Sequence, residues 1–91
     1  MRVTIKLFAG LAETGGKREF AIEVGENASL ADALAAIHAA HEEVGVHLST
    51  SLEAGYVNIL LDGRNVRFLD GMETKLRPDC VLAFLPPVGG G

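Results

Sequence analysis

The chain has 91 residues, of which 48% are hydrophobic and 22% are charged, so it has the length of one domain and enough apolar residues for a core. Its net charge of −4 disfavours DNA or RNA as a partner, because nucleic-acid affinity comes largely from basic residues. The single cysteine, Cys80, excludes an internal disulfide, and the apolar runs are too short to span a membrane. We therefore expect one folded cytoplasmic domain that binds neither nucleic acid nor membranes.

The N-terminal part predicts a β-hairpin. Residues 1–8 alternate between apolar and polar side chains, which is typical of a half-buried strand, and only Phe8 interrupts the polar face. A loop punctuated by glycines, residues 10–16, separates this segment from a second alternating stretch, residues 20–24. We expect the two strands to pair across this long turn.

A helix is expected next. Ser29 precedes Asp32 by three residues, the spacing of a capping box, so the helix should begin near Leu30. Apolar residues then recur at steps of three and four, which gives the helix one apolar stripe. Gly45 is expected to end it, and residues 46–55, which are polar and without clear periodicity, are expected to form a loop.

The C-terminal half predicts a second hairpin and a last strand. Residues 56–61 are apolar on both faces and lead into Asp62-Gly63, a strong hairpin signal, so we expect a central strand with residues 66–68 returning beside it. Leu76 should anchor the chain to the core. Residues 81–85 predict a short buried strand, which must end at the prolines that follow because proline has no N–H for the ladder.

The order of these elements is hairpin, helix, hairpin, strand. It predicts an α+β fold, whose common small version is the β-grasp, a mixed sheet crossed by one main helix. We expect this domain to occupy residues 1–85 and a flexible tail to occupy residues 86–91.

Side chains capable of chemistry are few. His38 and His41, with His47 close behind, could in principle hold a metal, but no acidic third ligand is evident and packing explains His41 at the edge of the apolar stripe. Cys80 follows Asp79, whose charge disfavours a thiolate. Phosphate-binding and nucleophile motifs are absent from the sequence. The sequence therefore predicts neither a bound metal nor a catalytic set.

The most informative segment is Pro86-Pro87-Val88-Gly89-Gly90-Gly91. Two prolines directly after a buried strand hold the chain extended, and three residues without Cβ make a strip that can thread a narrow active site. The reactive group of such a tail is the carboxylate of Gly91. A carboxylate is a poor acyl donor, so its use requires activation, for instance as an acyl-adenylate.

Several short segments carry a resemblance to a known family: Phe8-Ala9, Val57-Asn58-Ile59 before Asp62-Gly63, Val66-Arg67-Phe68, and a C-terminal Pro-Pro-Val-x-Gly-Gly pattern with Gly89 at x. Over essentially its whole length the chain resembles the ubiquitin-like sulfur carriers of the MoaD/ThiS type, which include the small subunit of molybdopterin synthase and the thiamine-pathway carrier. The resemblance implies a β-grasp fold and adenylation of Gly91 by an E1-like activating enzyme that uses ATP. Sulfur transfer would then give a thiocarboxylate.

The resemblance also implies a role. The chain would be a non-catalytic carrier without a permanently bound cofactor, donating sulfur from Gly91 to a biosynthetic partner such as a synthase large subunit, first of all in molybdopterin biosynthesis. Alternatives are sulfur transfer for cysteine, thiazole or tRNA thiolation, or a ubiquitin-like modifier whose activated Gly91 joins a lysine as an isopeptide. Residues 66–74 look closer to the carriers that serve cysteine biosynthesis, so the pathway is open. An adaptor domain with an idle tail is the blandest alternative.

The partner-binding residues are expected around the tail. Gly90 and Gly91 would enter the partner's active site first. The partner would also contact the residues that connect them to the domain, Pro86, Pro87, Val88 and Gly89. Phe8 and Leu85 are the apolar docking candidates, although ordinary core packing explains them equally well. Arg64 and Arg67, with Lys75 and Arg77 nearby, suggest an electrostatic footprint for an acidic partner, and a solvated surface is the alternative.

Overall fold

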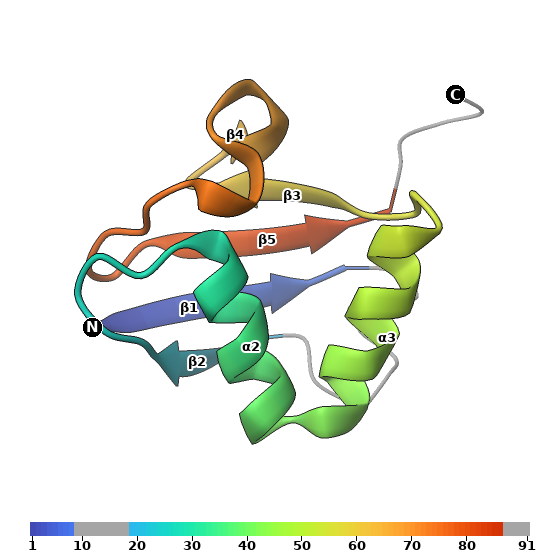
Figure 1. Ribbon diagram of the computed structural model, residues 1–91, viewed down its shortest axis with the longest axis horizontal. Coiled ribbons are helices and arrows are strands. Elements are labelled where there is room, and N and C mark those ends of the chain that lie inside the picture. The colour runs from blue at the N-terminus through green and yellow to red at the C-terminus, as the bar shows by residue number, and fades with distance from the viewer. Residues whose placement is uncertain (9–18, 87–91) are drawn as a thin grey trace.

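The computed structural model describes residues 1–8 and 19–86. Its five strands form one mixed sheet in the order β2-β1-β5-β3-β4. Two helices, α2 and α3, pack on one face of this sheet (Figure 1). The predicted α+β class is confirmed, and the topology is that of a β-grasp fold with a second helix added to the one expected. Within the described residues no helix is both long and apolar enough to cross a membrane.

The N-terminal hairpin forms as predicted. β1 (Arg2–Leu7) and β2 (Glu19–Glu23) pair antiparallel, with Val3 opposite Ile22 and Ile5 opposite Phe20. The side chains of β1 alternate between buried and accessible, as period-2 patterning requires when only one face is covered. The predicted turn at residues 10–16 lies outside the described residues.

The first helix begins where the capping box places it. α2 (Leu30–Ala40) has Ser29 as its N-cap, whose hydroxyl accepts from the Asp32 amide at 3.3 Å. The Asp32 carboxylate in turn accepts from the Ser29 amide at 2.9 Å. The stripe that the helix buries against the sheet consists of Leu30, Ala33 and Ile37.

The helix does not continue to Gly45, and the loop predicted for residues 46–55 is wrong. His41 leaves the helical conformation, with φ −140° and ψ 77°, and a second helix, α3 (Glu42–Glu53), follows it directly. Val44 and Leu48 lie in the core and Leu52 packs against it, so a four-residue spacing continues through the serines and threonine. Gly45 lies inside α3. A Cβ there would be 2.5 Å from the Cα of His38, so glycine permits close packing of the two helices.

The middle strand of the sheet is β5 (Val81–Leu85), parallel to β1 and antiparallel to β3 (Asn58–Leu61). β3 was expected to be central; it has a neighbour on each side, but β5 occupies the middle. The predicted turn is confirmed, with φ of 48° at Asp62 and 88° at Gly63.

The returning strand is shorter than predicted. β4 contains only Arg64–Asn65, and residues 66–68 form a 3-10 turn, η2 (Val66–Phe68), so the strand expected there is wrong. The Asn65 side chain accepts from the Arg67 amide at 2.9 Å and caps this turn. A second 3-10 turn, η3 (Gly71–Glu73), follows.

The segment before β5 is hydrogen-bonded both to the residues that precede α2 and to β1. Leu76 is buried as predicted, and its amide donates to the Ala28 carbonyl at 2.9 Å. Asp79 has a left-handed φ of 62°, and its amide donates to the Arg2 carbonyl at 2.8 Å. The turn into β5 therefore uses a conformation that favours glycine, although the sequence has aspartate there.

Candidate functional site

The candidate site lies at the end of the sheet where the C-termini of β1 and β5 lie side by side. These strands run parallel with Leu7 opposite Phe84, so their C-terminal ends lie side by side. The amide of Phe8 donates to the carbonyl of Phe84 at 3.1 Å, which fixes Phe8 next to the last residues of β5. The chain leaves the ladder at this end, since Leu85 pairs with Asn58 and the following Pro86 is exposed.

The structure brings together the two predicted apolar docking residues. Phe8 is 42% exposed and therefore is not a core residue, and Leu85 is half-buried. Pro86 begins the predicted tail. Its other members, Pro87 to Gly91, lie outside the described residues, and their roles stay predictions.

Phe8 and Leu85 belong to a larger apolar surface. Because side chains of a strand alternate, the residues that face the helices are buried and their neighbours point to the opposite face. The register places Ala83 between Lys6 and Leu60 on that opposite face, and all three are half-buried. We call Phe8, Leu60, Ala83 and Leu85 the outer strip. Both helices lie on the other side of the sheet (Figure 1), so no described element covers the outer strip.

The four basic residues expected to face an acidic partner lie in different surroundings. Arg64 pairs in register with Leu61, toward the beginning of β5, whereas Arg67 lines a groove beside Asn58, toward the end of β5. Both arginines are exposed. Arg77 forms an ion pair with Asp62 at 3.8 Å, and the Lys75 ammonium donates to the Asn27 carbonyl at 3.1 Å. Within residues 1–8 and 19–86, Arg64 and Arg67 form no ion pair, while the other two cations contact backbone and side chains of the turns.

The histidines have structural surroundings. The ring of His41 packs on that of Phe20, with centroids 4.5 Å apart and planes inclined by 60°. The backbone of His38 lies against Gly45. Among residues 1–8 and 19–86, no three His, Cys, Asp or Glu side chains come together as a metal site. Cys80 is buried in the core, out of reach of substrates.

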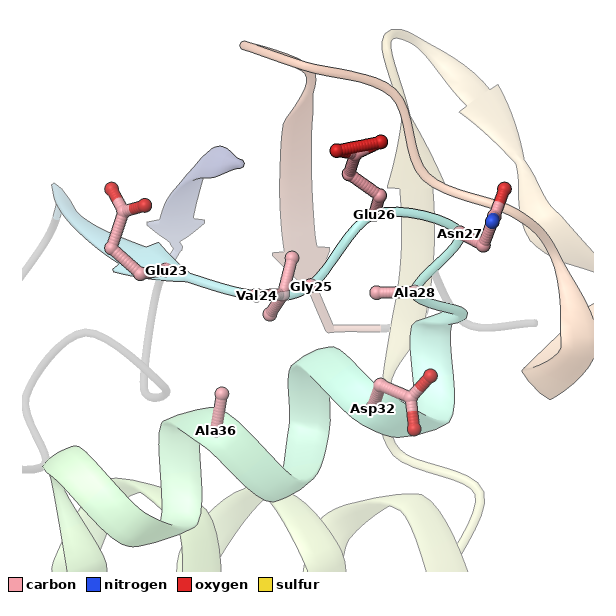
Figure 2. A pocket seen from close by; sticks show the side chains of 8 residues that line it. All are labelled: Glu23, Val24, Gly25, Glu26, Asn27, Ala28, Asp32 and Ala36. Carbon is pink, nitrogen blue, oxygen red and sulfur yellow. The ribbon is translucent and has the colours of Figure 1, made fainter.

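An acidic hollow lies between the β2–α2 connection and α2. Figure 2 shows Glu23 and Asp32 toward opposite ends of the hollow and Glu26 pointing away from the helix. The amide and hydroxyl of Ser29 hydrogen-bond to the Asp32 carboxylate and lower its pKa, so Asp32 is a helix cap. The three carboxylates do not converge, and the hollow offers no acid/base pair.

Sequence reasoning missed one residue of the outer strip and one element on the opposite, helix-bearing face of the sheet. Leu60 was assigned to a strand buried on both faces, although it belongs to the accessible outer strip. The end of α3, which carries Leu52, was assigned to a loop. The spacing of Val44, Leu48 and Leu52 was the signal that could have revealed it.

Comparisons with known proteins show the family and the fold of the chain. The model of the ThiS family matches residues 5–91. Small archaeal modifier protein 3 from Haloferax volcanii is 32% identical over the full length of both chains. The crystal structure of SAMP1 from Haloferax volcanii superimposes with a TM-score of 0.78 at 29% identity, again over the full length of both chains.

A further similar structure contains two different chains. It is the complex of subunits 1 and 2 of the molybdopterin-converting factor from Helicobacter pylori, which matches with a TM-score of 0.65 and 26% identity, over all of both chains. A relative of this chain therefore works in a complex with a second protein. The match over nearly the whole sequence, together with the shared topology, shows that the chain belongs to the ThiS family of ubiquitin-like, β-grasp proteins, alongside sulfur carriers and small archaeal modifiers.

Proposed function

We propose that the chain is a carrier of the small-modifier type whose C-terminal Gly91 is activated by a partner and then transferred to lysine amines of other proteins. The observation that carries this proposal is the full-length similarity to a small archaeal modifier protein at 32% identity. The relatives support this role, which the family resemblance implies only as an alternative, better than the narrower expectation of molybdopterin biosynthesis.

The chemistry begins with activation. An E1-like enzyme would use ATP, the Gly91 carboxylate attacking the α-phosphate so that pyrophosphate leaves and an acyl-adenylate forms. A lysine amine then attacks the carbonyl carbon and AMP leaves, which gives an isopeptide. If sulfide attacks the carbonyl carbon instead and AMP leaves, the product is a thiocarboxylate, so modifier and sulfur carrier share the first step. ATP is thus a substrate of the partner, and the cytoplasm is the compartment that fits this supply.

The described surface supports a role in docking to such a partner. The outer strip presents apolar side chains at the end of the sheet where Pro86 follows β5. An uncovered apolar strip beside the reactive segment lets one enzyme bind the domain and receive the tail at high effective concentration. The carrier itself needs no acid or base for this chemistry.

The proposal is tested in the native host with an antibody against the chain. Immunoblots should show species of higher mass, and fragmentation of these species should locate Gly91 on lysine side chains. A chain that lacks Gly90 and Gly91 should lose all of them. Gly25→Ala is the matched control, because a methyl group there meets nothing within 4 Å. Conjugates that persist without the two glycines would contradict the proposal.

A second candidate is sulfur transfer to a synthase in molybdopterin biosynthesis. It is favoured by the similarity to a putative subunit 1 of the molybdopterin-converting factor from Pyrococcus furiosus and to a chain of the Helicobacter pylori complex of subunits 1 and 2. In this case the chain from the host would carry sulfur in place of one terminal oxygen of Gly91, and conjugates would be absent. Intact-mass measurement separates the two candidates.

A further inference from the structure

A small apolar groove lies on the helix-bearing side of the sheet, opposite the outer strip. Its volume is about 200 Å³, and it is bounded by the beginning of α2, the end of α3, β3 and the two 3-10 turns. Among the residues that line it, Leu30, Ile59 and Val66 are buried, so the side chains most accessible to a ligand are those of Leu52, Arg67 and Met72. The groove is smaller than the cavities of roughly 300–1,000 Å³ that hold cofactors, so its size suits one or two protein side chains.

The two 3-10 turns that border this groove each carry an exposed large apolar side chain. Met72, which lines it, is 44% exposed. Phe68 belongs to the same 3-10 turn as Arg67 and is 86% exposed, the highest value among the large apolar residues of the described chain. Exposure of such side chains to water is unfavourable, and a cluster of them beside a groove is typical of a surface that a partner covers.

The charge of the groove selects the chemistry of that partner. Arg67 is the only charged residue of the lining, and its guanidinium forms no ion pair with any residue in 1–8 or 19–86. A guanidinium has five N–H donors in a planar arrangement that matches a carboxylate. A carboxylate beside an apolar side chain therefore complements this surface.

We propose that the groove docks a short segment of a partner protein in which one large apolar side chain adjoins an aspartate or glutamate. The apolar side chain fills the groove, the carboxylate pairs with Arg67, and Phe68 and Met72 are covered. Asn58 lines the groove and pairs in register with Leu85, so the docked partner lies at the end of the sheet from which the tail departs. The sheet separates this surface from the outer strip, so two partners can bind together.

This inference does not rest on the proposed function, because docking requires no activated C-terminus. Its test is an NMR titration of the full chain with capped hexapeptides that contain one central leucine or phenylalanine flanked by glutamates. Matched peptides carry glutamine or lysine in place of the glutamates. The glutamate peptides should shift amide signals of residues 57–59 and 66–72, with a Kd on the order of 1 mM, as expected for a short flexible ligand.

Two variants of equal net charge sharpen the test. Arg67→Glu should weaken the glutamate peptides about tenfold, whereas Arg64→Glu, outside the groove lining, should change their affinity less than about twofold. Both side chains are exposed, so both variants should fold. Equal losses in the two variants, or equal binding of glutamate and lysine peptides, would overturn the proposal. So would signals at the groove that shift with protein concentration alone, because the occupant would then be a second copy of the chain.

Discussion

Replacing Gly45 with alanine tests the packing of α3 against α2, which the sequence did not predict. The new Cβ would lie 2.5 Å from the Cα of His38 and 2.7 Å from both its Cβ and its Nδ1. The imidazole can rotate away, but the Cα belongs to the backbone of α2. The helices must therefore separate, and contacts of the buried Val44 and Leu48 loosen with them.

The magnitude follows from two opposing effects. Overpacking costs roughly 1–3 kcal/mol, and the upper part of this range applies because the obstructing atom is backbone. Alanine recovers up to about 1 kcal/mol through its higher helix propensity. We therefore expect the free energy of unfolding to fall by about 1–2 kcal/mol, which lowers the Tm of a domain of this size by roughly 4–16 °C.

Urea unfolding of the wild type and of Gly45→Ala measures this difference. The midpoint should fall while the m-value stays constant, because the unfolded surface is the same. Gly25→Ala is the control, since a Cβ there meets nothing within 4 Å and the change should be neutral or slightly stabilising. A Gly45→Ala chain as stable as the wild type, or more stable, would refute close packing of α2 and α3.

Three further predictions concern single positions and are measured by urea unfolding. Asp79→Gly should stabilise the fold by up to about 1 kcal/mol, because the left-handed φ of Asp79 suits glycine. The control Asp70→Gly, at φ −107°, should destabilise the fold by about 0.5–1 kcal/mol. A loss of stability in both variants would contradict the turn geometry. The hydrogen bonds from Ser29 lower the pKa of Asp32, so its contribution to stability is present above the ordinary aspartate pKa and is lost as the pH falls through the lowered value. The stability difference between wild type and Asp32→Asn should therefore shrink in acid, and a difference that grows there would be inconsistent with the capping box. Leu48→Ala should lower the free energy of unfolding by about 2–5 kcal/mol, because Leu48 is buried. Ser49→Ala, at the exposed neighbouring position, should lower it by less than about 0.5 kcal/mol. Similar effects at both sites would mean that α3 does not bury Leu48.

The elements that depend on neighbouring residues could be predicted from the sequence. The alternation of β1, the Ser29–Asp32 capping box and the Asp62-Gly63 turn are local signals, and the structure confirms each of them. α3 was missed because polar residues around Leu48 hide its apolar spacing, and because that spacing is stabilised by contact with α2 and the sheet. Helices of this length obtain most of their stability from such tertiary packing.

The site depends on contacts between distant parts of the chain, and it was therefore only partly predictable. Phe8 and Leu85 could be proposed separately, but their proximity follows from the parallel pairing of β1 with β5, which joins residues more than seventy positions apart. The groove near Arg67 was not foreseen, because it forms only where the end of α3 meets β3 and the 3-10 turns. The C-terminal pattern ending in Gly91 is a linear motif, so the sequence alone revealed it.

Activation of Gly91 is the central claim, and trapping the activated carbonyl tests it most directly. The chain is incubated in an extract of its native host with ATP and hydroxylamine, and its intact mass and fragments are then measured. Hydroxylamine attacks the acyl carbon and displaces AMP, so we predict a hydroxamate on Gly91 that forms only when ATP is present. A free carboxylate on Gly91 in every molecule, with and without ATP, would contradict the account.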